Sequence, residues 1–256
     1  MEKNMKKEER QTNILNMINQ AGQVTVNEIM DALSVSDMTV RRDLNDLSQR
    51  GLLVRTHGGA QRIVTAESGY ERSHIEKKSL HEEEKRQIAA KAAELVNDGE
   101  TIFLGPGTTL EQIAYSLRNK SIRVVTNSLP VFQILNHSSS ADLLLTGGEY
   151  RNITGAFVGS IAIRTVENMR FSKAFISSNG VMQNGVFTYS EAEGEIQKAA
   201  LNSATQKYLV ADSSKFGIFD FYEFYKTSDF DCIITDSEID DETLRELKEN
   251  SEVYIA

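Results

Sequence analysis

The sequence predicts two domains of different class: a small, mostly helical domain with a β-hairpin, followed by a larger α/β domain with a mostly parallel sheet. Three observations predict this division. Apolar residues recur at helical spacing in the first 60 positions, short apolar runs alternate with helical stretches from residue 81 onward, and the residues between show neither period. We therefore expect a first domain at 1–62, a linker at 63–80 and a second domain at 81–256.

The composition is ordinary for a globular protein, with 40% hydrophobic and 25% charged residues in 256. No run approaches the roughly 18 apolar residues of a membrane span, and the charged N-terminus argues against a secretory signal. The single cysteine, Cys232, excludes an intrachain disulfide and fits a reducing cytoplasm. The four histidines lack metal-ligand spacing among themselves and with Cys232, so we expect neither a metal nor another cofactor.

Charge is divided unevenly between the two predicted domains. The formal net charge is −9, yet residues 1–62 hold nine Lys and Arg against eight Asp and Glu. The remaining 194 residues hold nineteen against twenty-nine. This asymmetry indicates a small segment able to approach a polyanion and a larger one with another task.

Three helices are expected in the first domain. Their apolar positions are Ile14, Leu15 and Ile18 in the first, Val26, Ile29, Met30 and Leu33 in the second, and Val40, Leu44 and Leu47 in the third. Gly22 should end the first helix and Gly51 the third. Only three residues connect the second and third helices, and Ser36 among them is a good N-cap.

The opposite face of the third helix is polar and basic. It carries Met38, Arg42, Asn45 and Gln49, with Arg41 at the flank. Arg and Asn side chains can read base edges in the major groove, and a methionine can touch a thymine methyl group. Asp43 and Asp46 are expected nearer the flanks, each paired with an arginine.

A β-hairpin follows this helix. Residues 52–62, LLVRTHGGAQR, alternate like a strand, turn at Gly58-Gly59 and resume. Three helices and a hairpin make a winged helix-turn-helix, in which Arg55 and His57 would meet phosphate or the minor groove. Periodicity alone fits a plain three-helix packing unit equally well, and the arginines and asparagine favour DNA.

From residue 81 the pattern changes to that of a parallel sheet with helices. Residues 81–99 form an amphipathic helix with an acidic start. Strands and helices then alternate as TIFL, LEQIAYSL, IRVVT, LPVFQIL, DLLLT, KAFISS, EIQKAALNSA, KYLVA and CIITD. Strands of this length separated by helices are typical of a mostly parallel sheet.

Polar loops follow the strands of this predicted sheet. GPGTT directly follows TIFL and opens a helix, so Gly105, Gly107, Thr108 and Thr109 would offer backbone N–H groups and hydroxyls to a phosphate. Further loops end other strands: TNS at 126–128, TGG at 146–148, SSNG at 177–180 and ADSSKFG at 211–217. Ligands of open α/β sheets gather at the carboxyl ends of the strands, and this set supplies one cation, Lys215. The alternative is that loops contain Ser, Asn and Gly because turns need them.

The first domain resembles the DNA-binding domain of the DeoR family of bacterial repressors. The matching residues are Arg10, Ile14, Ile18, Ser36, Thr39, Val40, Arg41, Arg42, Asp43 and Leu44, followed by RTHGGA at 55–60. The resemblance implies contact with operator DNA through Ser36, Met38, Thr39, Arg41, Arg42, Asn45, Arg55 and His57. One such module buries little surface, so we expect at least a homodimer on paired half-sites.

Residues from about 85 to 236 resemble the effector domain of the same family, which shares its fold with ribose-5-phosphate isomerase and CoA-transferase-like proteins. The resemblance implies a site for a phosphorylated sugar at Gly105, Gly107, Thr108, Thr109, Thr126, Asn127, Ser128, Gly147, Gly148, Asn179, Glu193 and Lys215. Two positions depart from the family pattern: Gly105-Pro106-Gly107 replaces Asp-Ser-Gly, and Asn179 replaces an Asp. GPGTT, SSNG and TYSEAEGEIQ resemble the subfamily that represses lactose phosphotransferase systems, which implies tagatose 6-phosphate as effector.

Together these features predict a transcriptional repressor released from DNA by a sugar phosphate, and not an enzyme. An isomerase needs a positioned carboxylate near the substrate C–H, and Asn179 cannot serve as a base. Glu191 and Glu195 share one helix face that we expect to be solvated, whereas Glu193 could touch a ligand hydroxyl. An isomerase-like enzyme with a DNA-binding appendage, and a DNA-binding scaffold with a vestigial second domain, stay open as alternatives.

Overall fold

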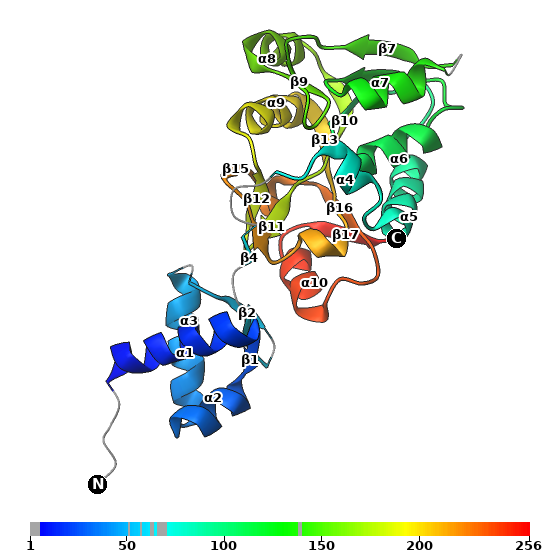
Figure 1. Cartoon of the computed structure of the whole chain (residues 1–256). Coiled ribbons are helices and arrows are strands. Elements are labelled where there is room, and N and C mark those ends of the chain that lie inside the picture. The colour runs from blue at the N-terminus through cyan, green and yellow to red at the C-terminus, as the bar shows by residue number, and fades with distance from the viewer. Residues whose placement is uncertain (1–5, 51, 57, 62–63, 66–70, 138–139) are drawn as a thin grey trace. The chain divides into compact units, whose positions relative to one another are not determined.

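A computed structural model describes residues 6–50, 52–56, 58–61, 64–65, 71–137 and 140–256. The chain divides into two compact units, Met1–Val64 and Thr65–Ala256. Among the described residues, no helix is both long and apolar enough to cross a bilayer. The predicted fold class is confirmed: a helical unit with a small sheet precedes a unit built on a parallel sheet (Figure 1).

The smaller unit contains three helices and a three-stranded antiparallel sheet. Its elements are α1 (Lys7–Ala21), β1 (Gln23–Thr25), α2 (Val26–Leu33), α3 (Asp37–Gln49), β2 (Val54–Thr56) and β3 (Gly59–Gln61). The three predicted helices are thus confirmed, with Gly22 at the C-cap of α1. Strand β1 was not predicted, and it pairs with β3 to give the sheet order β1-β3-β2.

Helical spacing explains the core of this unit. The expected apolar positions Ile14, Ile18, Ile29, Val40, Leu44 and Leu47 are all buried in one cluster. The hairpin differs slightly from prediction, because Gly59 pairs with Thr56 and therefore belongs to β3 and not to the turn. A side chain at Gly59 would collide with the backbone oxygen of Val24, 2.0 Å from an added Cβ, so the sheet itself requires this glycine. The predicted end of α3 at Gly51 lies outside the described residues.

The larger unit is organised by a seven-stranded sheet in the order β17-β16-β13-β10-β5-β6-β7. These strands are β5 (Thr101–Leu104), β6 (Arg123–Thr126), β7 (Asp142–Leu145), β10 (Phe171–Ile176), β13 (Ala204–Val210), β16 (Cys232–Thr235) and β17 (Glu252–Ile255). Every neighbouring pair is parallel. The chain runs outward from β5 through β6 to β7 and then returns to β10 on the other side of β5. Ligand crevices of open parallel sheets form at such a reversal.

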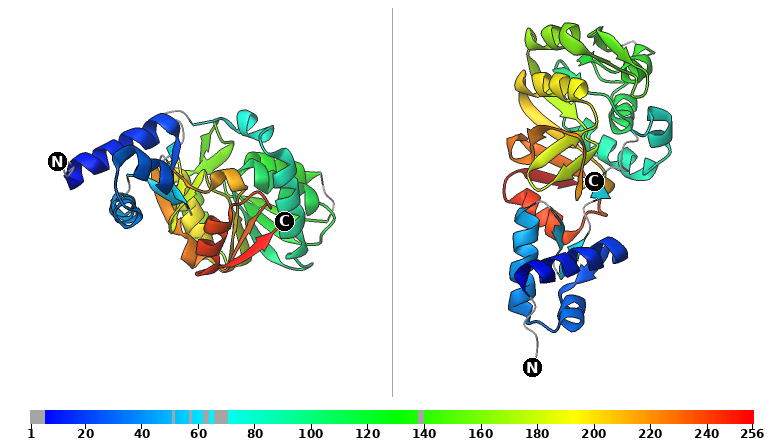
Figure 2. Two further views of the ribbon diagram at one scale, coloured as in Figure 1. Left: turned by 90° about the horizontal axis from the view of Figure 1, so that it is seen from below. Right: turned by 60° about the vertical axis from the view of Figure 1, so that its left-hand side comes forward.

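Helices cover both faces of this sheet. Helices α5 (Glu82–Glu94), α6 (Thr108–Ser116) and α7 (Leu129–Asn136) pack on one face, and α8 (Gly159–Glu167), α9 (Glu191–Asn202) and α10 (Asp241–Lys248) on the other. The right-hand view of Figure 2 shows α9 (yellow) and α5 (teal) on opposite sides. The helices expected from LEQIAYSL, LPVFQIL and EIQKAALNSA are confirmed, whereas α8 and α10 were not predicted.

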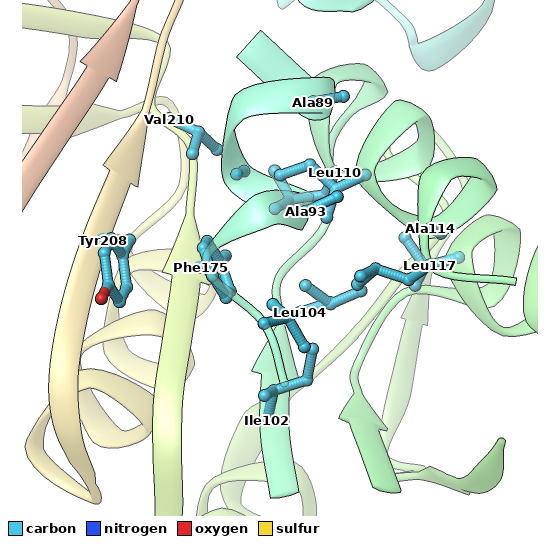
Figure 3. Packing of buried hydrophobic residues seen from close by; sticks show 14 of the residues in the cluster. Ala89, Ala93, Ile102, Leu104, Leu110, Ala114, Leu117, Phe175, Tyr208 and Val210 are labelled. Atoms are coloured by element: carbon cyan, nitrogen blue, oxygen red, sulfur yellow. The ribbon is translucent and has the colours of Figure 1, made fainter. Parts of the chain in front are cut away.

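Alternation along each strand divides the core in two. Ile102 and Leu104 face α5 and α6, while Phe103 between them faces the other cluster. Figure 3 shows Ile102, Leu104 and the stacked rings of Phe175 and Tyr208 opposite Ala93, Leu110 and Ala114 of the helices. The small residues Ala89, Ala92 and Ala93 of α5 are buried in the cluster on this face of the sheet.

Short elements complete the larger unit. They are α4 (His74–Lys78), β8 (Glu149–Arg151), β9 (Ala156–Val158), β11 (Gly180–Met182), β12 (Gly185–Thr188), β14 (Ile218–Phe219), β15 (Tyr222–Lys226) and two single 3₁₀ turns at Ser213–Lys215 and Thr227–Asp229. The two-residue strand β4 (Val64–Thr65) spans the boundary between the units. The predicted linker at 63–80 is not a plain linker over its described second half, since 71–80 contain helix α4 and contact the rest of this unit.

Candidate functional sites

Helix α3 presents a polar face to solvent. Ser36 caps its start by accepting a hydrogen bond from the Thr39 N–H, and the two hydroxyls lie 2.9 Å apart. Beyond the cap, Met38 is 80% exposed, and Arg42, Asn45 and Gln49 are exposed on the same side. Arg42 has no hydrogen bond or ion pair within the described part of the chain. This face therefore offers donors and a thioether for an incoming surface.

The flanks of α3 are held by its own acids. Arg41 donates to Asp37 one turn earlier at 2.8 Å, so its guanidinium is tethered beside the exposed face. Asp46 pairs with Lys7 of α1 and not, as predicted, with an arginine. The Lys7 ammonium holds the pKa of the Asp46 carboxyl below its ordinary value, mainly through the hydrogen bond between them.

The sequence prediction for Asp43 is half confirmed: it pairs with an arginine, Arg10, but it is buried and does not lie at the flank of α3. It is only 2% exposed and accepts hydrogen bonds from Arg10 and from Gln11 of α1. Arg10 is in turn mostly buried, so the pair fastens α1 against α3 from within. The adjacent residues Arg42 and Asp43 thus differ in role because successive helix positions are turned by about 100°.

The hairpin residues are less available than predicted. Arg55 is half-buried and donates to the Gly59 carbonyl at 2.9 Å, which stiffens the hairpin across its turn. His57 lies outside the described residues. Of the two predicted wing residues, Arg55 therefore has a structural bond in this structure, and its contact with DNA stays a prediction.

The GPGTT loop lies at the reversal point of the large sheet. Gly107 is the N-cap of α6 with φ +129°, a conformation that favours glycine, and no side chain caps this helix start. The first N–H groups of a helix have no intrahelical acceptor, so those of α6 are left to be satisfied from outside. A Cβ on Gly107 would lie 3.8 Å from Ser177, which places the loop beside the end of β10. Thr108 and Thr109 follow and are buried.

The TNS and TGG loops are used mainly by the fold. Thr126 accepts from the Ser128 N–H at 3.0 Å, and Ser128 accepts from the Val131 N–H to cap α7. Gly148 has φ +118°, and a Cβ there would lie 2.5 Å from the Val158 oxygen, so packing explains this glycine. Asn127 is different: its Nδ2 donates to Phe157, but its buried Oδ1 has no partner among the described residues.

The SSNG and ADSSKFG loops come together beside β10. The Gly217 N–H donates to Val181 at 2.8 Å, which joins the second loop to the strand that follows the first. Asn179 donates to buried Asp220 at 2.9 Å. Lys215 is half-buried, and its Nζ lies 4.0 Å from Oδ2 of Asp212, an oxygen that receives no hydrogen bond from the described residues.

The sequence prediction did not include two lysines of this cluster, because both precede the first strand of the sheet and lie in none of the loops that follow strands. Lys77 on α4 donates to Asn179 Oδ1 at 3.0 Å, and Lys85 on α5 donates to the carbonyls of Lys77 and Leu80. Burial lowers the pKa of each ammonium below the ordinary 10.5, and the charge of Lys215 lowers both further. The strand-end loops contribute Lys215 as their one predicted cation, and the structure adds Lys77 and Lys85.

A second missed group lies beside Lys77. Arg151 binds both oxygens of Glu71, at 3.1 and 2.6 Å, and its Nη1 lies 3.1 Å from Glu193. Glu193 is 4% exposed and also accepts from Thr154, so it anchors the 151–154 loop and is not open to solvent. The hydrogen bond to Glu71 raises the pKa of Arg151 above its ordinary value. Glu195, expected on a solvated face, accepts from the Tyr222 hydroxyl at 2.6 Å.

These residues form a polar cluster at the carboxyl edge of the sheet: Lys77, Lys85, Lys215, Asn179, Asp212, Asp220 and the uncapped start of α6. Ammonium groups held by these loops, together with a helix N-terminus, are suited to an anion. In the part of the chain that the structure describes, no three His, Cys, Asp or Glu side chains gather as a metal site.

Comparison with known proteins identifies both units. Residues 10–66 match the family model described as the DeoR-like helix-turn-helix domain, and residues 80–237 match the DeoR C terminal sensor domain. The chain belongs to the DeoR family. The resemblance inferred from the sequence is therefore confirmed.

Relatives within this family match along nearly the whole chain. A protein of Lactococcus lactis subsp. lactis, named lactose phosphotransferase system repressor, is 52% identical over 255 residues, which cover 98% of this chain and 100% of the relative. Proteins of the same name from Streptococcus mutans serotype c and Staphylococcus aureus strain N315 are 49% and 42% identical, covering 97% of this chain and 99% of each relative.

Solved structures match the DeoR-family chain only partly. Ribose 5 phosphate isomerase A from Neisseria gonorrhoeae gives a TM-score of 0.39 at 18% identity over 52% of each chain. The eIF2B delta subunit from Chaetomium thermophilum gives 0.41 at 18% identity, over 54% of this chain and 50% of that one. At these scores the matches carry no argument about function.

Proposed function

We propose that this protein is a transcriptional repressor of a sugar-catabolic operon that a phosphorylated sugar releases from its operator. The observation that carries the proposal is the presence, in one chain, of an exposed Met38–Arg42–Asn45 face on a helix-turn-helix and a lysine-rich cluster at a sheet reversal. The repressor names of full-length relatives support it.

In this proposal α3 enters the major groove. Arg42 and Asn45 contact base edges, Met38 touches a thymine methyl, and Arg41 reaches phosphate from the flank. Ser36 and Thr39 hold the start of α3 against the sugar-phosphate backbone of the DNA. Arg55 and His57 of the hairpin contact DNA phosphates. Two or more copies bind paired half-sites, since one module buries too little surface for useful affinity.

The effector is proposed to be tagatose 6-phosphate. Its phosphate binds at Gly105, Gly107, Thr108 and Thr109, and the Lys215 ammonium pairs with its negative charge. The side-chain oxygens of Asn127 and Asn179 accept hydrogen bonds from sugar hydroxyls. The relatives are named as repressors of a lactose phosphotransferase system, and the resemblance of the SSNG and GPGTT loops to that subfamily supports this choice of sugar. By linkage, an effector that weakens operator binding must bind the DNA-free protein more tightly than the DNA-bound one.

Fluorescence anisotropy on the DNA upstream of the protein's own gene tests this proposal. Salt is held fixed, because phosphate contacts make affinity strongly salt-dependent. Tagatose 6-phosphate should release the DNA, and unphosphorylated tagatose at equal concentration should not. Release by another sugar phosphate would keep the mechanism and overturn the effector, while DNA binding that no phosphate disturbs would contradict the sensor.

The proposal also predicts that the protein does not turn over its ligand. Asp220 places a carboxylate in the cluster, but its oxygens accept hydrogen bonds from Asn179 and from the Phe221 N–H. Incubation with tagatose 6-phosphate or ribose 5-phosphate, followed by NMR of the sugar, should show unchanged substrate. Isomerised product would revive the enzyme alternative.

A further inference from the structure

Helix α4 connects the two functions along the chain. It begins ten residues after Val64, the last residue of the smaller unit, and it lies wholly in the larger unit. It is short, but both ends are fixed. Ser73 and Glu76 form a capping box at its start, and Lys85 binds the carbonyls of Lys77 and Leu80 at its end.

Three further contacts place α4 on the larger unit. The His74 N–H donates to Ile153 at 2.8 Å, the His74 ring contacts buried Glu111 of α6, and Glu71 just before the helix binds Arg151. Glu111 lies in the first turn of α6, two residues after the end of GPGTT. The position of Lys77 is therefore imposed by the 151–154 loop and by the start of α6, which belongs to the polar cluster.

Lys77 lacks a carboxylate partner. Its one hydrogen bond goes to the neutral Asn179 amide, and no carboxylate oxygen of the described residues lies within 4.0 Å of its Nζ. An ammonium has three donors, so two are left without an acceptor among the described residues, in a half-buried position. A partly desolvated charge without a partner is costly, and an anion would relieve that cost.

Lys215 has a carboxylate partner, but only at long range. Its Nζ lies 4.0 Å from Oδ2 of buried Asp212, an ion pair too long for a hydrogen bond, and its charge lowers the pKa of both Lys77 and Lys85. Lys85 already directs two of its three donors to backbone carbonyls, so Lys77 and Lys215 are the better suited pair for an incoming anion. A doubly charged phosphate between these two would pair with both and remove their mutual repulsion.

We propose that Lys77 binds the phosphate of the effector together with Lys215, and that α4 thereby transmits occupancy to the DNA-binding domain. The inference deepens the proposed function and rests on it. On binding, the Lys77 ammonium exchanges the Asn179 oxygen for a phosphate oxygen. Helix α4 is displaced with it, and α4 is the first helix of the larger unit after the smaller one.

Lys77→Met tests the binding step, with Lys78→Met as its matched control. Lys78 is the next residue of α4, is exposed, and has no partner among the described residues. Calorimetric titration with tagatose 6-phosphate and with inorganic phosphate should show affinity at least about tenfold weaker for Lys77→Met. Lys78→Met should match wild type, and all three should bind operator equally without ligand. Lys77→Arg, which keeps the charge, should retain most of the affinity.

The outcomes separate the two proposals. Equal ligand affinity of Lys77→Met and wild type, or equal losses in Lys77→Met and Lys78→Met, overturns the role of Lys77 and leaves the repressor proposal standing. If the wild-type protein binds neither tagatose 6-phosphate nor inorganic phosphate, both the role of Lys77 and the proposed sensing of a sugar phosphate are overturned. If Lys77→Met fails to fold, Lys77→Gln and Lys77→Arg are compared, and a glutamine variant that binds like the arginine variant contradicts the charge argument.

Hydrogen–deuterium exchange tests the transmission step in the wild-type protein. Amide exchange in residues 71–80 should change when tagatose 6-phosphate binds, whereas exchange in strand β16 should not. Unchanged exchange in 71–80 at saturating ligand would overturn the transmission role of α4 while leaving ligand contact by Lys77 to be judged by the titration.

Discussion

Helix α3 and the carboxyl edge of the large sheet both present polar side chains, but they assemble them differently. The exposed face of α3 comes from 13 consecutive residues, and helical geometry decides which of them share a face. The sheet edge gathers residues from Glu71 to Asp220, and their proximity depends on strand order. A site on a single helix can therefore be predicted from the periodicity of its sequence. A site assembled from distant residues can be recognised only once the fold is known.

The two regions also differ in how function and stability are separated. On α3 they alternate along one helix, with Arg42 outside and Asp43 inside. At the sheet edge the same residues serve both, since Asn179 binds Lys77 and also Asp220. A substitution on α3 should therefore change either DNA binding or stability. A substitution of Asn179 at the sheet edge should change both ligand binding and stability.

The largest effect is expected for Asp43→Ala. It leaves the mostly buried Arg10 guanidinium without its carboxylate, which costs about 3 kcal/mol of the unfolding free energy of the smaller unit. Amide exchange in α1 and α3 should rise accordingly. Asp46→Ala, three residues along on the exposed side, is the control and should leave that exchange unchanged.

The single cysteine shows whether Asp43→Ala acts on one unit only. Cys232 is buried in β16, and burial raises the pKa of its thiol to about 12, so it reacts with thiol reagents only when the larger unit opens. Its labelling rate should not change in Asp43→Ala. A faster rate would mean that the two units do not unfold separately.

Arg42→Ala should have the next largest effect, on DNA binding alone. Loss of one bidentate base contact weakens operator binding about ten- to a hundredfold, with preference for the operator over unrelated DNA reduced. Anisotropy at fixed salt measures both. Lys248→Ala on α10 removes the same unit charge from an exposed position and is the control. A folded Arg42→Ala protein with unaltered operator binding would refute the assignment of α3.

Lys215→Ala should affect the ligand and spare the operator. We expect tagatose 6-phosphate affinity to fall about tenfold, as for loss of one charge-assisted hydrogen bond, with operator affinity in the absence of ligand within about twofold. Titration calorimetry and anisotropy measure the two quantities separately, again with Lys248→Ala as reference. Normal release of the operator by ligand would remove Lys215 from the site.

The smallest effect concerns pH. Burial lowers the pKa of Lys77, and the groups that act on it are Glu71, Glu193 and Asp220, which favour its charge, and Lys215, which opposes it. A lowered pKa means that Lys77 loses its proton before an ordinary lysine does. Sugar-phosphate affinity should therefore fall severalfold as pH rises toward the ordinary 10.5, and remain flatter in Lys77→Arg. A wild-type profile as flat as that of the arginine variant would contradict a role for this ammonium.

The same reasoning from linkage gives the sign for stability. Between the lowered pKa of Lys77 and 10.5, the unfolded chain binds the proton more tightly than the folded one. The contribution of Lys77 to stability therefore increases with pH in that window, while its contribution to ligand binding decreases. Opposite trends in unfolding and in ligand titration would identify the group that titrates.

Local geometry allowed much of this protein to be predicted from its sequence. The apolar positions of α1, α2 and α3, the Ser36 cap and the alternating strands of the sheet follow from short-range periods that tertiary contacts reinforce. The loops after the strands were also foreseeable, because parallel strands end on one edge. The DNA-facing roles of Arg42 and Asn45 stay predictions of that kind.

Only the tertiary structure decided the partners. It turned Asp43 inward to Arg10, gave Glu193 to Arg151, and placed residues 71–80, expected as linker, against the loops of the sheet. No period marks these pairs, since they join positions 33 to 102 residues apart, and a buried charge is satisfied by whatever the fold brings near it. The sequence by itself determined the elements and most of their exposed faces, while chain topology brought Lys77 to Asn179, 102 residues further along the chain.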